Sequence, residues 1–158
     1  MREIKLTKGK ISLVDDKDFE YLNSFKWHAS NWGYAVRTIG RRGVRKDIFM
    51  HREILQPKGV EFCDHINRNK LDNQRENLRI ATRSQNCMNK TKSWGNSSKY
   101  KGVYRNKRIS KWYSQIYDKN FGGIYLGSFE SEKDAAEAYN LNAKRIFGEF
   151  ACVNVLYS

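Results

Sequence analysis

The stretch from Cys63 to Asn86, CDHINRNKLDNQRENLRIATRSQN, combines residue types that can hydrolyse a phosphodiester bond. Asp64 and His65 are adjacent, and Asn77 and Asn86 follow behind them. A neutral imidazole accepts a proton near physiological pH, so His65 can act as the base that activates water. Carboxylate and amide oxygens are the ligands that Mg²⁺ prefers, so Asp64 and Asn86 can hold a cation that offsets charge on the phosphate.

The elements around this stretch are expected to bring these side chains together. GVEFCDH (59–65) and ENLRIA (76–81) are predicted to be strands, and Thr82 is a good cap for a helix over TRSQNCMNK (82–90). Adjacent residues of a strand point in different directions, so Asp64 can face a metal while His65 faces a water. This strand–loop–strand–helix unit would return Asn86 to the side of Asp64.

The composition of the whole chain predicts a polyanionic partner. Of 158 residues, 30 are Lys or Arg and 17 are Asp or Glu, which gives a formal net charge of +13. No acid occurs between Asn77 and Tyr117, where basic residues alternate with Trp and Tyr. Such a run is better explained by contact with phosphates than by a solvated surface, so double-stranded DNA is the expected partner.

The cysteines and the other two histidines have no clear place in this chemistry. Cys63, Cys87 and Cys152 form no CxxC pair, so reduced, packed cysteines are expected, with zinc shared by Cys63 and Cys87 as a minor alternative. His28 is expected to be structural. His51 can support the site, contact phosphate or simply pack.

The N-terminal 60 residues are predicted to mix short strands with a helix. KISLVDD (10–16) favours a strand, DDKDFEYLNSFKW (15–27) a helix, and GYAVRTIG (33–40) with VRKDIFMHREIL (44–55) a hairpin whose second strand can run into a short helix. Residues 1–47 receive no distinct function. Basic side chains there that can contact phosphate are Arg37, Arg41, Arg42, Arg45 and Lys46.

A polar segment, MNKTKSWGNSS, predicts a linker, set at residues 91–98. Beyond it, strands are predicted over 100–106, 111–118 and 123–129, and a helix over 131–148. Ser131 and Asp134 resemble a capping box, and Gly148 is a stop signal. Residues 99–158 are therefore expected to form a three-stranded antiparallel sheet packed on one helix.

DHINRNKLDNQRENLRIATRSQN, with the preceding MHREIL, resembles the HNH nuclease motif in the His-Asn-Asn form of phage and intron-encoded homing endonucleases. The resemblance implies a ββα-metal finger, with its core at about 48–90. It makes His65 the general base, Asp64 and Asn86 the ligands of a divalent metal, most readily Mg²⁺, and Asn77 the residue that braces the loop. Asn73 is an alternative for that central Asn.

The segment from Tyr100 to Asn154 resembles the plant ethylene-response-factor, or APETALA-two, DNA-binding domain, which implies a sheet that lies in the major groove. The sheet arginines of the plant domains are replaced here, so their base specificity does not carry over. Core packing is the alternative for Trp112. The predicted DNA contacts are Lys101, Tyr104, Arg105, Lys107, Arg108, Lys111, Trp112, Gln115 and Tyr117.

Together these features predict an α+β protein with a nuclease module and its leader in residues 1–90 and a DNA-binding domain in 99–158. The expected activity is a metal-dependent, site-preferring endonuclease of the homing type that cuts double-stranded DNA; the resemblance to the HNH family implies that the products carry a 5′-phosphate and a 3′-hydroxyl. A DNA-binding regulator with a vestigial nuclease and a restriction or defence nuclease stay open as alternatives. No membrane span and no obligate protein partner is indicated, so the cytoplasm of a bacterial or phage-infected cell is the expected location.

Overall fold

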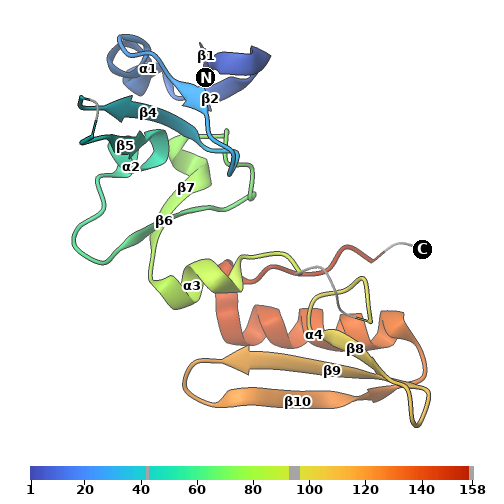
Figure 1. The fold of residues 1–158 in the computed structure, drawn as a ribbon. Helices are drawn as coiled ribbons and strands as arrows, with labels where there is room; N and C mark the ends of the chain where they lie inside the picture. The colour runs from blue at the N-terminus through green and yellow to red at the C-terminus, as the bar shows by residue number, and fades with distance from the viewer. Residues whose placement is uncertain (42, 93–96, 157–158) are drawn as a thin grey trace. The chain divides into compact units, whose positions relative to one another are not determined.

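Small antiparallel sheets organise the residues that the computed structural model describes, which are 1–41, 43–92 and 97–156. The chain divides into two compact units, Met1–Asn86 and Cys87–Ser158. The mixture of short strands and few helices confirms the predicted α+β class (Figure 1). Part of the predicted linker, residues 93–96, lies outside the described residues, and among the described residues no helix is long and apolar enough to cross a membrane.

The first sheet pairs β1 (Arg2–Lys5) with β2 (Ile11–Val14), and the 3-10 turn η1 (Thr7–Gly9) joins them. Sequence patterning missed β1, because only Ile4 within it is buried. Helix α1 (Asp16–Asn23) follows β2 directly. The helix predicted over 15–27 was too long at its end, because the chain leaves the helix at Ser24 and Trp27 then joins the core beside Leu22.

The predicted hairpin and short helix are present in the second sheet. Its strands are β3 (His28–Ala29), β4 (Ala35–Ile39) and β5 (Lys46–Phe49), paired in that order. Helix α2 (Met50–Leu55) begins at the residue after β5. Its Met50 and Ile54 pack into the same apolar core as β1, β2 and α1. This core is the platform on which the next elements rest.

The expected strand–loop–strand–helix unit follows. Strand β6 (Phe62–His65) pairs antiparallel with β7 (Leu78–Ala81), and the 3-10 turn η2 (Arg75–Asn77) leads into β7. Helix α3 (Arg83–Met88) comes next, and the division between the two units falls within it. Leu78 belongs to the N-terminal core, which fixes the hairpin on its platform.

The second unit has the predicted sheet and helix. Strands β8 (Val103–Asn106), β9 (Lys111–Asp118) and β10 (Gly122–Phe129) form a sheet in the order β10-β9-β8, and α4 (Glu132–Phe147) lies along one face of it (Figure 1). The Ser131 hydroxyl accepts a hydrogen bond from the Asp134 amide at 3.0 Å, as the capping prediction requires. The helix ends before the 3-10 turn η3 (Gly148–Phe150).

Gly102 lets the start of β8 approach α4 closely. Its φ is +73°, and a Cβ built there would overlap the Tyr139 ring and come within 2.6 Å of the Gln115 carbonyl oxygen. Gly122 has the same φ of +73°, but a Cβ there would meet nothing within 4 Å. Comparing a substitution at Gly102 with one at Gly122 therefore separates the cost of backbone strain from the cost of steric overlap.

We expect Gly102→Ala to destabilise the C-terminal unit much more than Gly122→Ala does. Both changes force an L-residue into the left-handed region, at a cost of roughly 1–2 kcal/mol. Only Gly102→Ala adds overpacking, typically about 1–3 kcal/mol, which should lower the midpoint of the unit's calorimetric transition by roughly 5 °C or more beyond the control. Equal midpoints for the two variants would contradict this packing.

Candidate active site

Strand β6 ends with the two residues that carry the predicted chemistry. Asp64 stands opposite Arg79 of β7, and His65 stands opposite Leu78, so the two side chains leave opposite faces of the hairpin. Each of them is only 5% exposed. The prediction that neighbouring strand residues serve different partners therefore has a structural basis.

Arg79 holds the carboxylate of Asp64. Its Nε and Nη2 both donate to Asp64 Oδ2, at 2.9 and 2.8 Å, and both side chains are largely buried. A charge-assisted contact of this kind fixes the plane of the carboxylate. A metal ligand gains from such orientation, since outer partners tune the geometry and basicity of a ligand.

A chain of hydrogen bonds assigns the proton on His65. The Ser12 hydroxyl donates to the Leu71 carbonyl oxygen at 2.9 Å, so Ser12 Oγ accepts from Asn73 Nδ2 at 2.7 Å. This turns Asn73 Oδ1 toward His65 Nε2, which is 3.1 Å away. Because an amide oxygen only accepts, Nε2 carries the hydrogen, and the lone pair of the neutral ring lies on Nδ1. Nδ1 is therefore the basic nitrogen.

Aromatic rings surround His65 on its buried side. The His51 ring lies 5.1 Å from the His65 ring and 5.1 Å from the Tyr34 ring, and Phe49 lies 5.6 Å from His51, all measured between centroids. Burial lowers the pKa of His65, against the opposing effects of the Asn73 hydrogen bond and the Asp64 charge. Burial and the neighbouring His65 lower the pKa of His51 to about 3. Both rings are thus neutral near pH 7, the form that a base needs.

Asn77 spans the loop between β6 and β7. Its Oδ1 accepts from the Asn67 amide at 2.9 Å, and its Nδ2 donates to the Asp72 carbonyl at 2.8 Å. These bonds tie the two ends of the loop together, as the predicted brace would. Asn73, the alternative central Asn, makes a different contact and touches His65 itself.

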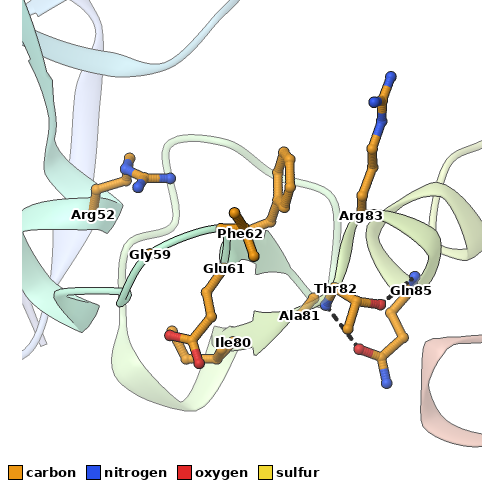
Figure 2. Close-up of a pocket in the computed structure, with 10 residues that line it drawn as sticks. Arg52, Gly59, Glu61, Phe62, Ile80, Ala81, Thr82, Arg83 and Gln85 are labelled. Carbon is orange, nitrogen blue, oxygen red and sulfur yellow. Dashed lines mark hydrogen bonds between the residues drawn. The ribbon is translucent and has the colours of Figure 1, made fainter.

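Asn86 lies in the first turn of α3. Thr82 and Gln85 cap this helix reciprocally: the Thr82 amide donates to Gln85 Oε1 at 2.8 Å, and the Gln85 amide donates to Thr82 Oγ1 at 3.2 Å (Figure 2). The Asn86 amide donates to the Thr82 carbonyl at 3.0 Å. In the part of the chain that the structure describes, no hydrogen bond joins Asn86 to Asp64, so the expected return of Asn86 to Asp64 stays a prediction.

The donor set suits a hard divalent cation in an open site. Within the described ranges, no three His, Cys, Asp or Glu side chains gather into a metal cage. Asp64 and Asn86 offer oxygen ligands, and Mg²⁺ typically takes one or two carboxylates and completes its shell with water and phosphate. Burial raises the pKa of the Cys63 thiol to about 11, which disfavours the thiolate that zinc requires.

The DNA contacts predicted in the second unit divide between the two faces of its sheet. Val103, Ser114 and Ile116 are buried on the side that packs on α4. By the strand register, the opposite face is open and polar-aromatic. It carries the predicted Tyr104, Lys111, Gln115 and Tyr117, together with Tyr113 and Tyr125, which sequence reasoning did not select.

Some predicted contacts have internal partners instead. Trp112 packs against the buried cluster under α4, the core alternative that its sequence left open, and Arg105 lies 5.6 Å above its ring. Lys101 Nζ donates to the carbonyl oxygens of Met88 and Lys90, at 2.6 and 2.7 Å. Lys107 and Arg108 are exposed in the turn between β8 and β9.

The basic residues of the first unit also differ from one another. Arg37 pairs with Glu53 at 3.2 Å and stacks over Phe25 at 3.9 Å, so its role is at least partly structural. Arg41, Arg45 and Lys46 are exposed near the hairpin turn, and Arg42 lies outside the described residues.

An open pocket of about 670 Å³ lies beside the β6–β7 hairpin (Figure 2). Arg52, Phe62, Ile80 and Arg83 are among the residues that line it, and none of the residues assigned to catalysis or metal binding does. A nuclease does not need a deep cavity for its scissile phosphate, which the outside of the duplex presents. We therefore place the candidate site at the end of β6 rather than in this pocket.

Known proteins match this chain in the region of that site. The family model described as HNH endonuclease matches residues 57–88. An uncharacterized HNH endonuclease of Acanthamoeba polyphaga mimivirus is 34% identical over 151 residues, which cover 93% of this chain and 76% of that protein. The chain belongs to the HNH endonuclease family. Its first unit is consistent with the ββα-metal fold, and the protein is a nuclease.

Plant proteins match part of this HNH endonuclease. An AP2/ERF and B3 domain-containing transcription repressor of Arabidopsis thaliana is 40% identical over 58 residues, 37% of this chain and 16% of that protein. Dehydration-responsive element-binding protein 2D of the same plant is 32% identical over 85 residues, 52% of this chain and 41% of that protein. No solved structure matches the chain.

We expect His51 to make the stability of the N-terminal unit depend on pH. Its folded pKa of about 3 lies below the ordinary value of 6.5, so the unfolded chain takes up the proton first as pH falls. The stabilisation is complete above pH 6.5 and is lost as pH drops toward 3. Between about pH 7.5 and 5, wild type should lose about 2 kcal/mol more than His51→Phe in urea unfolding.

His28→Phe is the matched control, because His28 lies outside the ring cluster. The loss of stability assigned to His51 should remain in this variant. Parallel stability curves for wild type and His51→Phe across this range would show that His51 is not held neutral by burial.

Proposed function

We propose that this HNH endonuclease is a metal-dependent, site-preferring enzyme of the homing type that cuts double-stranded DNA. The observation that carries the proposal is the pairing of His65, with its basic nitrogen defined by Asn73, and the buried, oriented carboxylate of Asp64 at the end of one strand. The match to the HNH family supports the same residues.

In the proposed reaction, His65 Nδ1 removes a proton from a water molecule, and the water oxygen attacks the phosphorus. A new P–O bond forms while the bond from phosphorus to the 3′ oxygen breaks, and the departing oxygen takes a proton from solvent. The products are a 5′-phosphate and a 3′-hydroxyl. The buried ring wall of Tyr34, Phe49 and His51 keeps His65 neutral and fixed for this transfer.

Asp64 and Asn86 are the residues that would hold the divalent metal, with Mg²⁺ as the first candidate. When bound, the cation offsets the negative charge that develops on the phosphate and on the leaving oxygen. Arg79 keeps the Asp64 carboxylate in one orientation before any ligand arrives. Asn77 keeps the loop that carries Asn73 in its conformation.

The C-terminal unit is proposed to hold the duplex through its open sheet face. Tyr104, Tyr113 and Tyr125 stack edge to face across the three strands, with centroids 6.1 and 5.6 Å apart, while Lys107 and Arg108 add charge at the rim. The printed names of two plant relatives include transcription repressor and element-binding protein, which supports a DNA-binding role here. The exposed cations would supply phosphate contacts, and the aromatic face would meet the groove.

We expect His65→Ala to abolish cleavage and leave DNA binding nearly intact. The base acts on water and contributes little contact with bound DNA, so the rate should fall on the order of 100- to 10,000-fold while affinity changes little. Cleavage of plasmid and phage DNA with Mg²⁺, and binding by fluorescence anisotropy, would measure the two effects.

His28→Ala should cleave at the wild-type rate, and wild type treated with a chelator should not cleave. A His65→Ala protein that cuts within a few-fold of wild type would remove His65 from the mechanism. Chelator-resistant cutting would remove the metal.

The rim of the open sheet face should determine the salt dependence of DNA binding. Replacing Lys107 and Arg108 by Gln should lower the log–log salt slope by about 0.9 for each phosphate that is no longer neutralised, so by about 1.8 for the pair. Replacing Lys144 and Arg145 by Gln removes the same charge from α4, on the other side of the sheet, and should change the slope little. Equal changes for the two pairs would show that only net charge matters.

A further inference from the structure

The N-terminal strand β2 is hydrogen-bonded to the loop that carries Asn73, the residue that contacts His65. The Leu13 amide donates to the Leu71 carbonyl at 2.8 Å, and the Asn73 amide donates to the Leu13 carbonyl at 2.8 Å. The segment around Asn73 is therefore an extra, parallel neighbour of β2. These residues lie about sixty positions apart in the sequence, so the contact was not predictable from local patterns.

The residues that follow β2 in the sequence bind the same loop at Arg75, two positions beyond Asn73. The Arg75 amide donates to Asp15 Oδ2 at 2.8 Å, and the Arg75 guanidinium donates to both oxygens of Asp18, at 2.7 and 2.8 Å. Asn73 is thus held between two anchors that both come from the N-terminal segment. Its backbone has little freedom to move away from His65.

The side chain of Asn73 is fixed as firmly as its backbone. Asn73 and Ser12 are both 0% exposed, so bulk water cannot replace their hydrogen bonds. If the Asn73 amide were flipped, its oxygen would face Ser12 Oγ, and the Ser12 hydroxyl could donate to it only by turning its hydrogen away from the Leu71 carbonyl oxygen. The flipped amide would also turn Nδ2 toward His65 Nε2 and favour the ring form with its hydrogen on Nδ1.

We propose that Ser12 and Asn73 are positioning residues that select the Nε2-protonated form of His65, which makes β2 a working part of the nuclease site. This inference rests on the proposed role of His65 as the base. It gives the N-terminal segment a function that its sequence did not reveal: Ser12 orients Asn73, and Asn73 places the lone pair on the nitrogen that accepts the proton from water.

The first test reads the protonated nitrogen directly and needs no nuclease activity. A nitrogen-15 spectrum of the histidine rings in the full-length, metal-free protein at about pH 8, where neutral imidazole dominates, separates the two ring forms. The chain has three histidines, so His65→Gln identifies the His65 signals. Wild type should show hydrogen on Nε2, and Ser12→Ala should show a mixture or hydrogen on Nδ1.

The second test asks whether the ring form matters for cleavage. Ser12→Ala should lower kcat about tenfold with KM for duplex DNA unchanged, the size expected from removing one hydrogen bond. Ser12→Thr keeps the hydroxyl and should recover most of the rate. Ser114→Ala is the matched control, since Ser114 is also 0% exposed but its hydroxyl has no hydrogen-bond partner in the described residues.

The outcomes separate this inference from the proposed function. Hydrogen on Nδ1 in wild type overturns the inference, whatever the enzyme cuts. An unchanged ring form and unchanged kcat in Ser12→Ala overturn it as well. The expected ring spectra combined with full cleavage by His65→Ala would instead keep Ser12 and Asn73 as the selectors of the ring form and reject His65 as the base.

Discussion

The need to satisfy buried polar groups governs the first unit of this HNH endonuclease. Asp64, His65, Asn73 and Asn77 are each at most 7% exposed, and each has a defined hydrogen-bond partner. Leaving a buried donor or acceptor without a partner costs about 1–3 kcal/mol of folding free energy. Each of these side chains is therefore restricted to the one orientation in which its hydrogen bonds are made. The same requirement that stabilises the fold therefore sets the geometry of the proposed base and of the proposed metal ligand before any DNA binds.

The two units solve different physical problems. The first hides its polar side chains and surrounds them with rings and an apolar core, which suits proton transfer. The second buries small alanines under its sheet and keeps Tyr117, Tyr125 and several cations exposed, which suits contact with a charged, grooved polymer. The residues proposed for proton transfer and those proposed for DNA binding are therefore separate, so variants should weaken one and spare the other.

Local signals were sufficient to predict the nuclease hairpin and the C-terminal unit. The strand-like segments 59–65 and 76–81 contained β6 and β7, and the hydroxyl caps Thr82 and Ser131 located the starts of α3 and α4. Contacts between distant segments were not predictable, because Ser12 carries no local sign of a partner near residue 73. The pairing of Asp64 with Arg79 could be predicted only if the register of β6 and β7 were known. The packing of Trp112 into the core could be predicted only if the position of α4 were known.

The hydrogen bonds between β2 and the loop at Asn73 also determine which residues must be transferred together if the nuclease unit is moved to another protein. The recognisable family signature occupies residues 57–88, yet the bonds that shape its loop originate between Ser12 and Asp18. Grafting the signature alone onto another DNA-binding protein would leave out these bonds. A chimera that carries residues 1–88 would keep both these bonds and the whole of α3, so the functional piece of this protein is longer than its recognisable signature.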